Sequence, residues 1–441
     1  MKQTILRELG DGLVLRRATA ADADALCAFN AKIHGTDSYD ARAVAAWTRD
    51  LLLKPHPTFQ PEDFLIVEKS GTGEIVSSLS LISQTWAYEG IPFGVGRPEL
   101  VGTLPEYRGK GLVRVQFDVI HEWSRERGEL VQIITGIPFF YRQFGYEMGL
   151  EMGGSRRGSE GQVPQLKENE EDPYHVRPAR EADIPFLMRM KERADRYSMI
   201  TSVRDEAIWR YEILGKSQEN VNRLEFCVIE AQDGTLVGYL AYPWFAWGTT
   251  QVVTEYQLAE DVSYLSVTPS VLRYLRTLGQ RNAQARGQTL QTVGLELGTT
   301  NLAYHAAEGM LPVENRPYAF YVRVPNLPAF LQHIAPILER RLRDSAVAGH
   351  SGELKISFYR EGLRMVLEKG KLACVEPWKP KINEDEGAAA FPNLTFLQLV
   401  FGYRSLSTLR AAYADVGARP DAKILLETMF PAKPSYIWSL S

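Results

Sequence analysis

The stretch VGTLPEYRGKGLVRVQF, residues 101–117, decides the fold of the first part of the chain. It begins as a short strand, is interrupted at Pro105, and continues into the basic turn RGKG at residues 108–111. Apolar residues then recur at helical spacing from Leu112 onward. The turn therefore precedes a helix, whose free N–H groups and dipole favour an anion. Two cations in the turn make a phosphate the expected ligand.

Three kinds of phosphate loop compete for this turn. A Walker loop requires Gly-Lys-Ser/Thr, which nothing after Gly111 supplies. A dinucleotide loop requires a third glycine and an acid after the next strand, but Gly136 follows the strand at 130–135. The pyrophosphate loop of acetyl-coenzyme A enzymes, Arg/Gln-x-x-Gly-x-Gly/Ala, is met by Arg108 and Gly111 and departs only at Val113. This third type fits best.

Composition sets the broad class of the protein. The chain has 441 residues, of which 45% are hydrophobic and 24% charged, as is usual for a globular protein with several domains. Its 50 basic and 54 acidic residues exclude the large positive field of a nucleic-acid-binding protein. Three scattered cysteines and the lack of a signal peptide or apolar run predict a cytoplasmic protein that does not enter membranes.

An internal repeat divides the first three quarters of the chain. LRRATAADADAL (15–26) returns as VRPAREADIPFL (176–187), and the predicted hairpin at 63–81 returns at 225–242. Two matched elements in the same order and at the same spacing predict a duplicated domain. The second copy lacks the basic glycine turn, so we expect it to keep the scaffold without the anion site.

The remaining segments complete the predicted domain plan. A polar, glycine-rich linker at 153–173 separates the copies, and after the segment at 322–342 the pattern changes again to strands followed by a helix. The sequence thus predicts an α/β protein with domains at 1–155, 174–325 and 326–441. The first two are tandem mixed-sheet domains, and the third is of α+β type.

The segment IITGIPFFYRQFGYE (133–147) adds a strand, a Gly-Ile-Pro break and a short aromatic helix. With the arginine-glycine loop before it, this order resembles the GNAT acetyltransferase superfamily. The tandem copies and the distinct tail resemble its enhanced-intracellular-survival branch. In that branch an active GNAT domain precedes a degenerate one and a sterol-carrier-protein-like domain. The resemblance covers nearly the whole chain and implies an N-acetyltransferase, a homo-oligomer (a hexamer in that branch) and acetyl-coenzyme A as co-substrate.

The resemblance and the chemistry together indicate the residues that hold the coenzyme. The loop N–H groups and nearby guanidinium groups are suited to the pyrophosphate, and the preceding strand offers backbone groups to the pantetheine. The resemblance places the N–H that polarises the acetyl group on Val101. The predicted coenzyme-binding residues are Val101, Gly102, Thr103, Arg108, Gly109, Lys110, Gly111, Leu112 and Arg114. No spacing among the histidines and cysteines suggests a metal.

The resemblance also suggests the groups that move protons. Tyr141 matches the tyrosine of the family's YxxFG turn and is the predicted general acid for the leaving thiolate. Two carboxylates are alternative bases. One is that of Ser441 at the end of the apolar tail, as the resemblance implies. The other is Glu99, which strand alternation places on one face with Val101 and Thr103.

The predicted reaction transfers an acetyl group to a small-molecule amine, of the aminoglycoside or lysine type in the family resembled. Alternatives are another tandem acyltransferase that forms a small-molecule amide, and a non-catalytic acyl-coenzyme A or lipid-binding protein, which the sterol-carrier-like tail suggests. A polycationic acceptor requires acidic pocket walls. The candidates for such walls are Asp37, Asp40 and Glu89.

Overall fold

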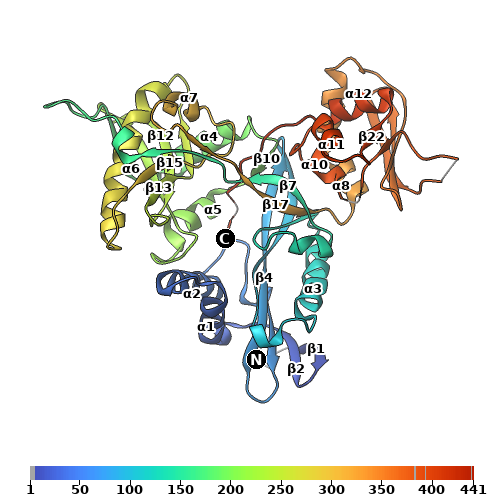
Figure 1. The fold of residues 1–441 in the computed structure, drawn as a ribbon, viewed down its shortest axis with the longest axis horizontal. Helices are drawn as coiled ribbons and strands as arrows, with labels where there is room; N and C mark the ends of the chain where they lie inside the picture. Colours follow the sequence, from blue (N-terminus) through green and yellow to red (C-terminus); the bar gives the residue numbers. More distant parts are fainter. Residues whose placement is uncertain (1–4, 382–383, 393, 439) are drawn as a thin grey trace.

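The computed structural model describes residues 5–381, 384–392, 394–438 and 440–441 of the chain. Figure 1 shows three lobes, formed in chain order by the first repeat, the second repeat and the tail. The carboxyl end of the chain lies near the centre, between the first two lobes. The described residues include no helix with the length and apolar character needed to cross a membrane.

The first lobe is built on one long mixed sheet. Helices α1 and α2 lie on one side of its central strands and α3 on the other (Figure 1). The strands run in the order β1-β2-β3-β4-β5-β6-β17-β7, and β10 pairs with the far end of β4. The bounds are β1 Ile5–Gly10, β2 Leu13–Arg17, α1 Ala23–His34, α2 Ser38–Leu53, β3 Phe64–Lys69, β4 Glu74–Tyr88, β5 Ile91–Thr103, α3 Leu112–Glu126, β6 Val131–Ile134, β7 Glu147–Met152, β10 Ile200–Ser202 and β17 Tyr318–Arg323.

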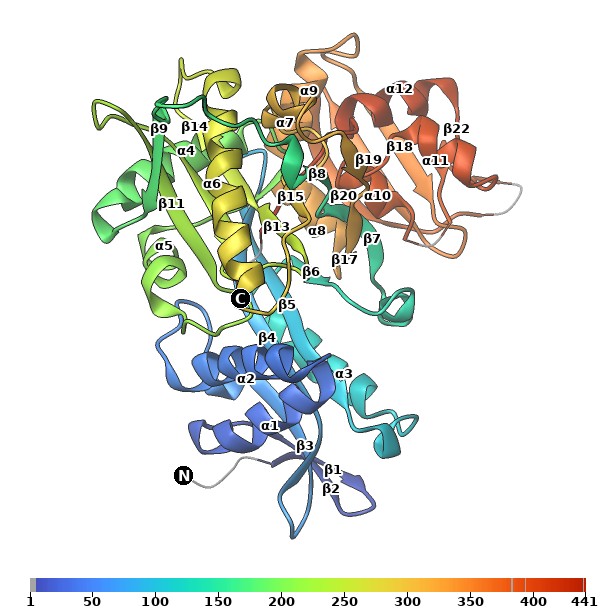
Figure 2. The same ribbon diagram turned by 60° about the vertical axis from the view of Figure 1, so that its left-hand side comes forward.

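The second lobe holds two smaller sheets, and its long helix α6 runs along their strands (Figure 2). The sheet orders are β14-β12-β11-β9 and β13-β15-β8-β16. The bounds are β8 Ser155–Ser159, β9 Tyr174–Pro178, α4 Ile184–Asp195, α5 Glu206–Arg210, β11 Leu224–Ala231, β12 Leu236–Pro243, β13 Thr250–Val253, β14 Glu255–Leu258, α6 Tyr264–Gln284, β15 Thr292–Leu295, α7 Ala303–Ala307 and β16 Val313–Asn315.

An ion-pair cluster is repeated in the two copies. Arg16 binds Asp22 at 2.7 Å and Glu68 at 2.5 Å at the start of the first copy. In the second copy Arg177 binds Asp183 and Glu230, each at 2.7 Å. In both copies the arginine lies near the end of a strand, and its ion pair with the aspartate holds the turn that precedes the next helix. The same triad on the same elements supports the duplication predicted from the sequence.

The two copies exchange one strand. β8 follows the first copy in sequence, yet it pairs with β15 and β16 of the second. Reciprocally, β17 is the last strand of the second copy in sequence, yet it lies between β6 and β7 of the first. One sheet in each copy therefore contains a strand from outside that copy's own segment of the chain. The two folded units do not coincide with the segments 1–155 and 174–325 predicted from the sequence.

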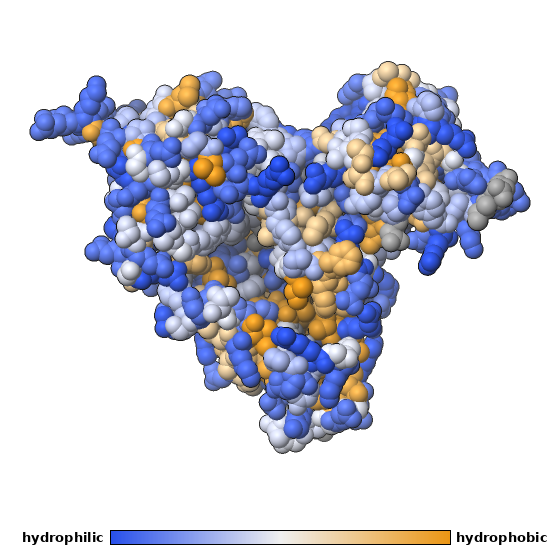
Figure 3. Space-filling model, in the orientation of Figure 1, coloured by the Kyte–Doolittle hydropathy of each residue, from blue (hydrophilic) through white to orange (hydrophobic). Residues whose placement is uncertain are grey.

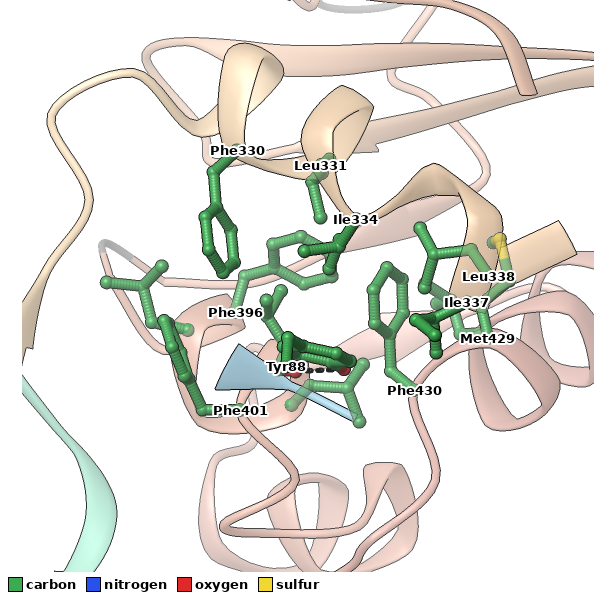
Figure 4. Close-up of a cluster of buried hydrophobic side chains, with 14 of the residues drawn as sticks. Tyr88, Phe330, Leu331, Ile334, Ile337, Leu338, Phe396, Phe401, Met429 and Phe430 are labelled. Atoms are coloured by element: carbon green, nitrogen blue, oxygen red, sulfur yellow. Dashed lines mark hydrogen bonds between the residues drawn. The ribbon is translucent and has the colours of Figure 1, made fainter. Parts of the chain in front are cut away.

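The third lobe is a five-stranded sheet with short helices, and it shares a core with the first. Tyr88 of β4 donates a hydrogen bond to the carbonyl of Val400 at 2.8 Å, and Phe330 stacks on Phe401 (Figure 4). The sheet order is β20-β19-β18-β21-β22. The bounds are α8 Leu327–His333, α9 Ala335–Arg343, β18 Gly352–Ser357, β19 Gly362–Glu368, β20 Lys371–Trp378, β21 Ala389–Ala390, α10 Phe396–Val400, α11 Leu406–Ala412, β22 Gly417–Ala418 and α12 Pro420–Met429.

Candidate active site

The centre of the site is the outer half of β5, where the strand separates from β6 and its pairing with β4 is irregular. β5 pairs with β6 only at Val95 and Gly96, so the edge beyond them faces open space. On the other edge the register with β4 shifts between Glu99 and Gly102, which is a β-bulge. Leu100 has a φ of 52°, a left-handed value that is unusual for leucine. Leu100 and Val101 therefore have no paired residue on β4.

The bulge overturns the alternation expected from the sequence. Glu99 faces Ser80 and Gly102 faces Ser78, which lie on the same face of β4. Thr103 points to the opposite face, where its Oγ1 lies 2.8 Å from Oγ of Ser77. Glu99 and Thr103 are therefore on different faces, because the bulge inserts one residue between them. A period of two cannot reveal an inserted residue.

The glycine turn lies at the amino end of α3, as the sequence predicts. Gly109 and Gly111 have φ values of 78° and 76°, and a Cβ at either position would meet no atom within 4 Å. Gly111 caps the helix without a side-chain hydrogen bond, so the N–H groups of the first turn stay available. Arg114 donates a hydrogen bond to Oε1 of Gln143 at 2.7 Å, which holds its guanidinium beside the turn.

One cavity of about 930 Å³ joins the bulge to the turn. It brings together ten of the residues predicted for the site, namely Glu99, Val101, Gly102, Thr103, Arg108, Gly109, Gly111, Leu112, Arg114 and Tyr141. Two predicted residues do not line it. Lys110 lies in the same turn with its Nζ 3.8 Å from Oδ2 of Asp11, and Ser441 is buried elsewhere with 1% of its surface exposed.

Tyr141 enters the cavity from the short helix at 140–144. Its ring packs 5.6 Å from that of Tyr321, which the exchanged strand β17 supplies. Its hydroxyl faces the turn after β6, since a Cβ on Gly136 would lie 3.8 Å from it. Burial, reinforced by the negative charge of Glu99, raises the pKa of Tyr141. The phenol therefore keeps its proton at neutral pH and can donate it.

Glu99 and the tail are linked through Arg97. Nη2 of Arg97 lies 2.5 Å from Oε1 of Glu99. Nη1 of Arg97 donates a hydrogen bond to the carbonyl of Leu440 at 2.9 Å, and Gln84 donates another at 2.8 Å. The apolar tail thus docks beside the site, but only Glu99 of the two candidate bases reaches the cavity wall.

His34, at the end of α1, also lines the cavity and was not singled out from the sequence. Its Nε2 is buried and has no hydrogen-bond partner among the described residues. Burial lowers the pKa of His34, although the negative charge of Glu99 and the contact of the imidazole with the backbone of Leu100 act in the opposite direction. The imidazole is therefore neutral at pH 7. No sequence pattern signals this residue, because α1 meets β5 only through tertiary packing.

The tail narrows the corresponding cleft of the second copy to a cavity of about 160 Å³, which Tyr256, Tyr264 and Tyr436 help to line. β13 and β15 run parallel up to Val253 and Leu295 and then separate. The hydroxyl oxygen of Tyr436, from the tail, lies 2.5 Å from the carbonyl oxygen of Thr254 and 2.6 Å from that of Glu296, just beyond, so its one proton is shared between the two strands. The helix that follows, α6, is preceded by Glu260 and Asp261 in place of cations. Among the described residues no cluster of three or more His, Cys, Asp or Glu could share a metal ion.

Comparison with known proteins assigns the first domain. Residues 15–149 match the acetyltransferase (GNAT) domain family, and this segment contains the bulge, the turn and Tyr141. No curated protein matches the chain. The first domain is thus a GNAT acetyltransferase domain, and the protein is an acyltransferase.

The fold of the whole chain is similar to three solved structures. A probable N-acyltransferase from Enterococcus faecalis V583 has 13% identity and a TM-score of 0.66, with 97% of this chain and 100% of that chain covered. A GCN5-related N-acetyltransferase from Kribbella flavida has 19% identity and a TM-score of 0.61, with 97% and 98% covered. Eis1 from Mycobacterium abscessus has 14% identity and a TM-score of 0.60, with 97% and 99% covered. At such identities the similarity shows a common fold.

Proposed function

We propose that the protein is an acetyl-coenzyme A-dependent N-acetyltransferase that acts on an amine. The observation that carries the proposal is the single cavity that joins the free edge of β5, the amino end of α3 and the side chain of Tyr141. The N–H groups of the turn, with Arg108 and Arg114, bind the pyrophosphate. The open edge of β5 accepts the pantetheine as an added strand.

The reaction follows from the groups around the thioester. The N–H of Val101 donates a hydrogen bond to the acetyl oxygen, whose charge grows as the amine nitrogen attacks the carbonyl carbon. The C–N bond forms and the C–S bond breaks. A carboxylate, that of Glu99 or of Ser441, takes the proton that the amine loses. Tyr141 gives its proton to the departing thiolate.

The test is acetyl transfer by the purified protein. We expect acetyl-coenzyme A and a panel of primary amines to yield free coenzyme A and the acetylated amine in equal amounts, measured by thiol titration and mass spectrometry. The Tyr141→Phe variant is the matched control for slow uncatalysed transfer. Acetyl-coenzyme A that binds without release of the thiol for any amine would contradict the proposal.

The same proposal includes membership of the enhanced-intracellular-survival branch, with a sterol-carrier-like third domain and a homo-oligomeric assembly. The fold shared with Eis1 over 97% of this chain supports the branch. Light scattering on the eluting peak of a size-exclusion column measures the mass directly. A monomer mass of 49.7 kDa at micromolar concentration would contradict the oligomer.

A further inference from the structure

The two ends of the cavity are built from different elements. The glycine turn and Arg114 form one end, while residues from α1 and α2 form the other, namely Ile33, His34, Val44 and Trp47. In the proposed function, on which this inference rests, the pyrophosphate occupies the turn. The end under α1 and α2 is then left for the acceptor amine. We call the side chains of Ile33, His34, Val44 and Trp47 the acceptor wall.

The acceptor wall carries no acidic side chain. Glu99 is the one carboxylate among the described residues that line the cavity, and Arg97 already pairs with it at 2.5 Å. The neutral imidazole of His34 adds no charge. A polycation would have to strip water from several ammonium groups here and would meet one partly neutralised carboxylate in return. That exchange is unfavourable.

The acids that the sequence offered for a polycation site are used elsewhere. Asp37 accepts hydrogen bonds from the N–H groups of Tyr39 and Asp40 and so caps α2. Asp40 accepts from Thr36. Glu89 pairs with Arg340, Arg341 and Lys433 at the contact with the third lobe. None of the three lines the cavity, so the expectation of acidic walls is wrong for these residues.

The acceptor wall is instead apolar and incomplete. Apolar residues gather in the hollow between α2 and α3, on the face shown in Figure 3. Trp47 is 6% exposed, yet its Nε1 has no hydrogen-bond partner among the described residues. A buried donor without a partner is costly unless a bound molecule or water satisfies it. The wall is thus suited to an apolar body that carries a hydrogen-bonding group.

We propose that the acceptor is a monoamine with an apolar body, and that polycations such as aminoglycosides and polyamines are poor acceptors. The apolar body packs on Ile33, Val44 and Trp47, and the single amine lies beside Glu99 at the bulge. Burial of a phenyl-sized group should raise kcat/KM for such an amine by about tenfold or more, compared with an amine that leaves the acceptor wall exposed to water.

The decisive measurement compares kcat/KM for phenethylamine, spermine and kanamycin at saturating acetyl-coenzyme A. We expect phenethylamine to exceed both polycations by about tenfold or more. Equal or better transfer to either polycation would overturn the inference and leave the proposed acetyltransferase standing. Binding of acetyl-coenzyme A by calorimetry, with no thiol release for any of the three, would overturn both.

A variant tests the wall itself. Ile33 is half-buried on the wall, and Ile33→Asp adds the missing carboxylate. We expect the ratio of kcat/KM for phenethylamine to that for spermine to fall about tenfold. Leu53→Asp is the matched control, since Leu53 is 50% exposed at the end of α2 and should leave the ratio unchanged. An unchanged ratio in a folded Ile33→Asp protein would overturn the wall assignment, and the wild-type comparison stands without any variant.

Discussion

At the scale of single residues, Tyr141 has two separable parts, a ring that packs in the core and a hydroxyl that reaches the cavity. We expect Tyr141→Phe to lower kcat by about 10²- to 10⁴-fold, because the thiolate then leaves without its proton donor. The dissociation constant of acetyl-coenzyme A, measured by calorimetry, should hardly change. Tyr146→Phe is the matched control, because this neighbouring hydroxyl contacts Nε2 of His121 at 2.9 Å. Equal losses in both variants would assign Tyr141 to packing alone.

The choice of base is also decided by one residue. Glu99 lines the cavity and Ser441 does not, so we expect Glu99→Gln to lower kcat more than removal of Leu440 and Ser441 does. Removal of the two residues also takes away the Leu440 carbonyl that Arg97 contacts. Because Arg97 pairs with Glu99, we expect this change to shift Glu99 and to lower kcat by a smaller factor. Steady-state kinetics over a pH series distinguishes the two roles. Full activity of Glu99→Gln would transfer the role to the tail.

A buried histidine predicts how stability depends on pH. Burial and the nearby charge of Lys216 lower the pKa of His56 to about 3, against about 6.5 in an unfolded chain. Between these values the unfolded chain binds a proton that the folded protein rejects, so the free energy of unfolding falls as pH falls. The loss is about 2 kcal/mol from pH 7 to pH 5.

Urea titrations at pH 7 and pH 5 measure this loss. His56→Gln removes the titrating ring, so the variant should lose about 2 kcal/mol less than the wild type over this interval. The exposed residue His305 provides the control variant, His305→Gln. If both variants kept the pH dependence of the wild type, protonation of His56 would not be its cause.

At the scale of elements, the turn before α3 should govern coenzyme affinity. Gly111→Leu places a side chain where the pyrophosphate binds and strains a left-handed residue, and Arg108→Ala removes a charged partner. We expect each to raise the dissociation constant of acetyl-coenzyme A by about tenfold or more. Gly128, at the other end of α3, has a φ of 70° and equally open space, so Gly128→Leu is the matched control. Unchanged affinity in folded variants would refute the anion site.

The elements also show which features the sequence could predict. The turn and α3 were predictable because glycine, charge and helical period act within a few neighbouring residues. The bulge at Leu100 was not, because it depends on which residue of β4 faces which residue of β5. The contact of His34 with β5 has the same origin. Local patterns therefore locate the coenzyme loop, whereas tertiary packing builds the acceptor wall.

At the scale of the whole molecule, the strand exchange ties the second copy to catalysis. β17 belongs in sequence to the second copy, yet its Tyr321 packs against Tyr141 and accepts a hydrogen bond from the N–H of Phe139 at 2.5 Å. The repeat was visible in the sequence, but the exchange was not, because both copies carry an equivalent strand. We infer that the first domain needs the second for a complete site.

The two copies should nevertheless bind only one coenzyme per chain. In the second copy, Tyr436 occupies the gap between the separating strands, and acids precede α6 where the first copy has cations. We expect titration calorimetry with acetyl-coenzyme A to give a stoichiometry of one. Tyr436→Ala opens the gap but leaves Glu260 and Asp261 to repel a phosphate, so the stoichiometry should stay at one in that variant too. Two equivalent sites in the wild type would refute the asymmetry, and a second site only in Tyr436→Ala would show that the tail alone blocks the second copy.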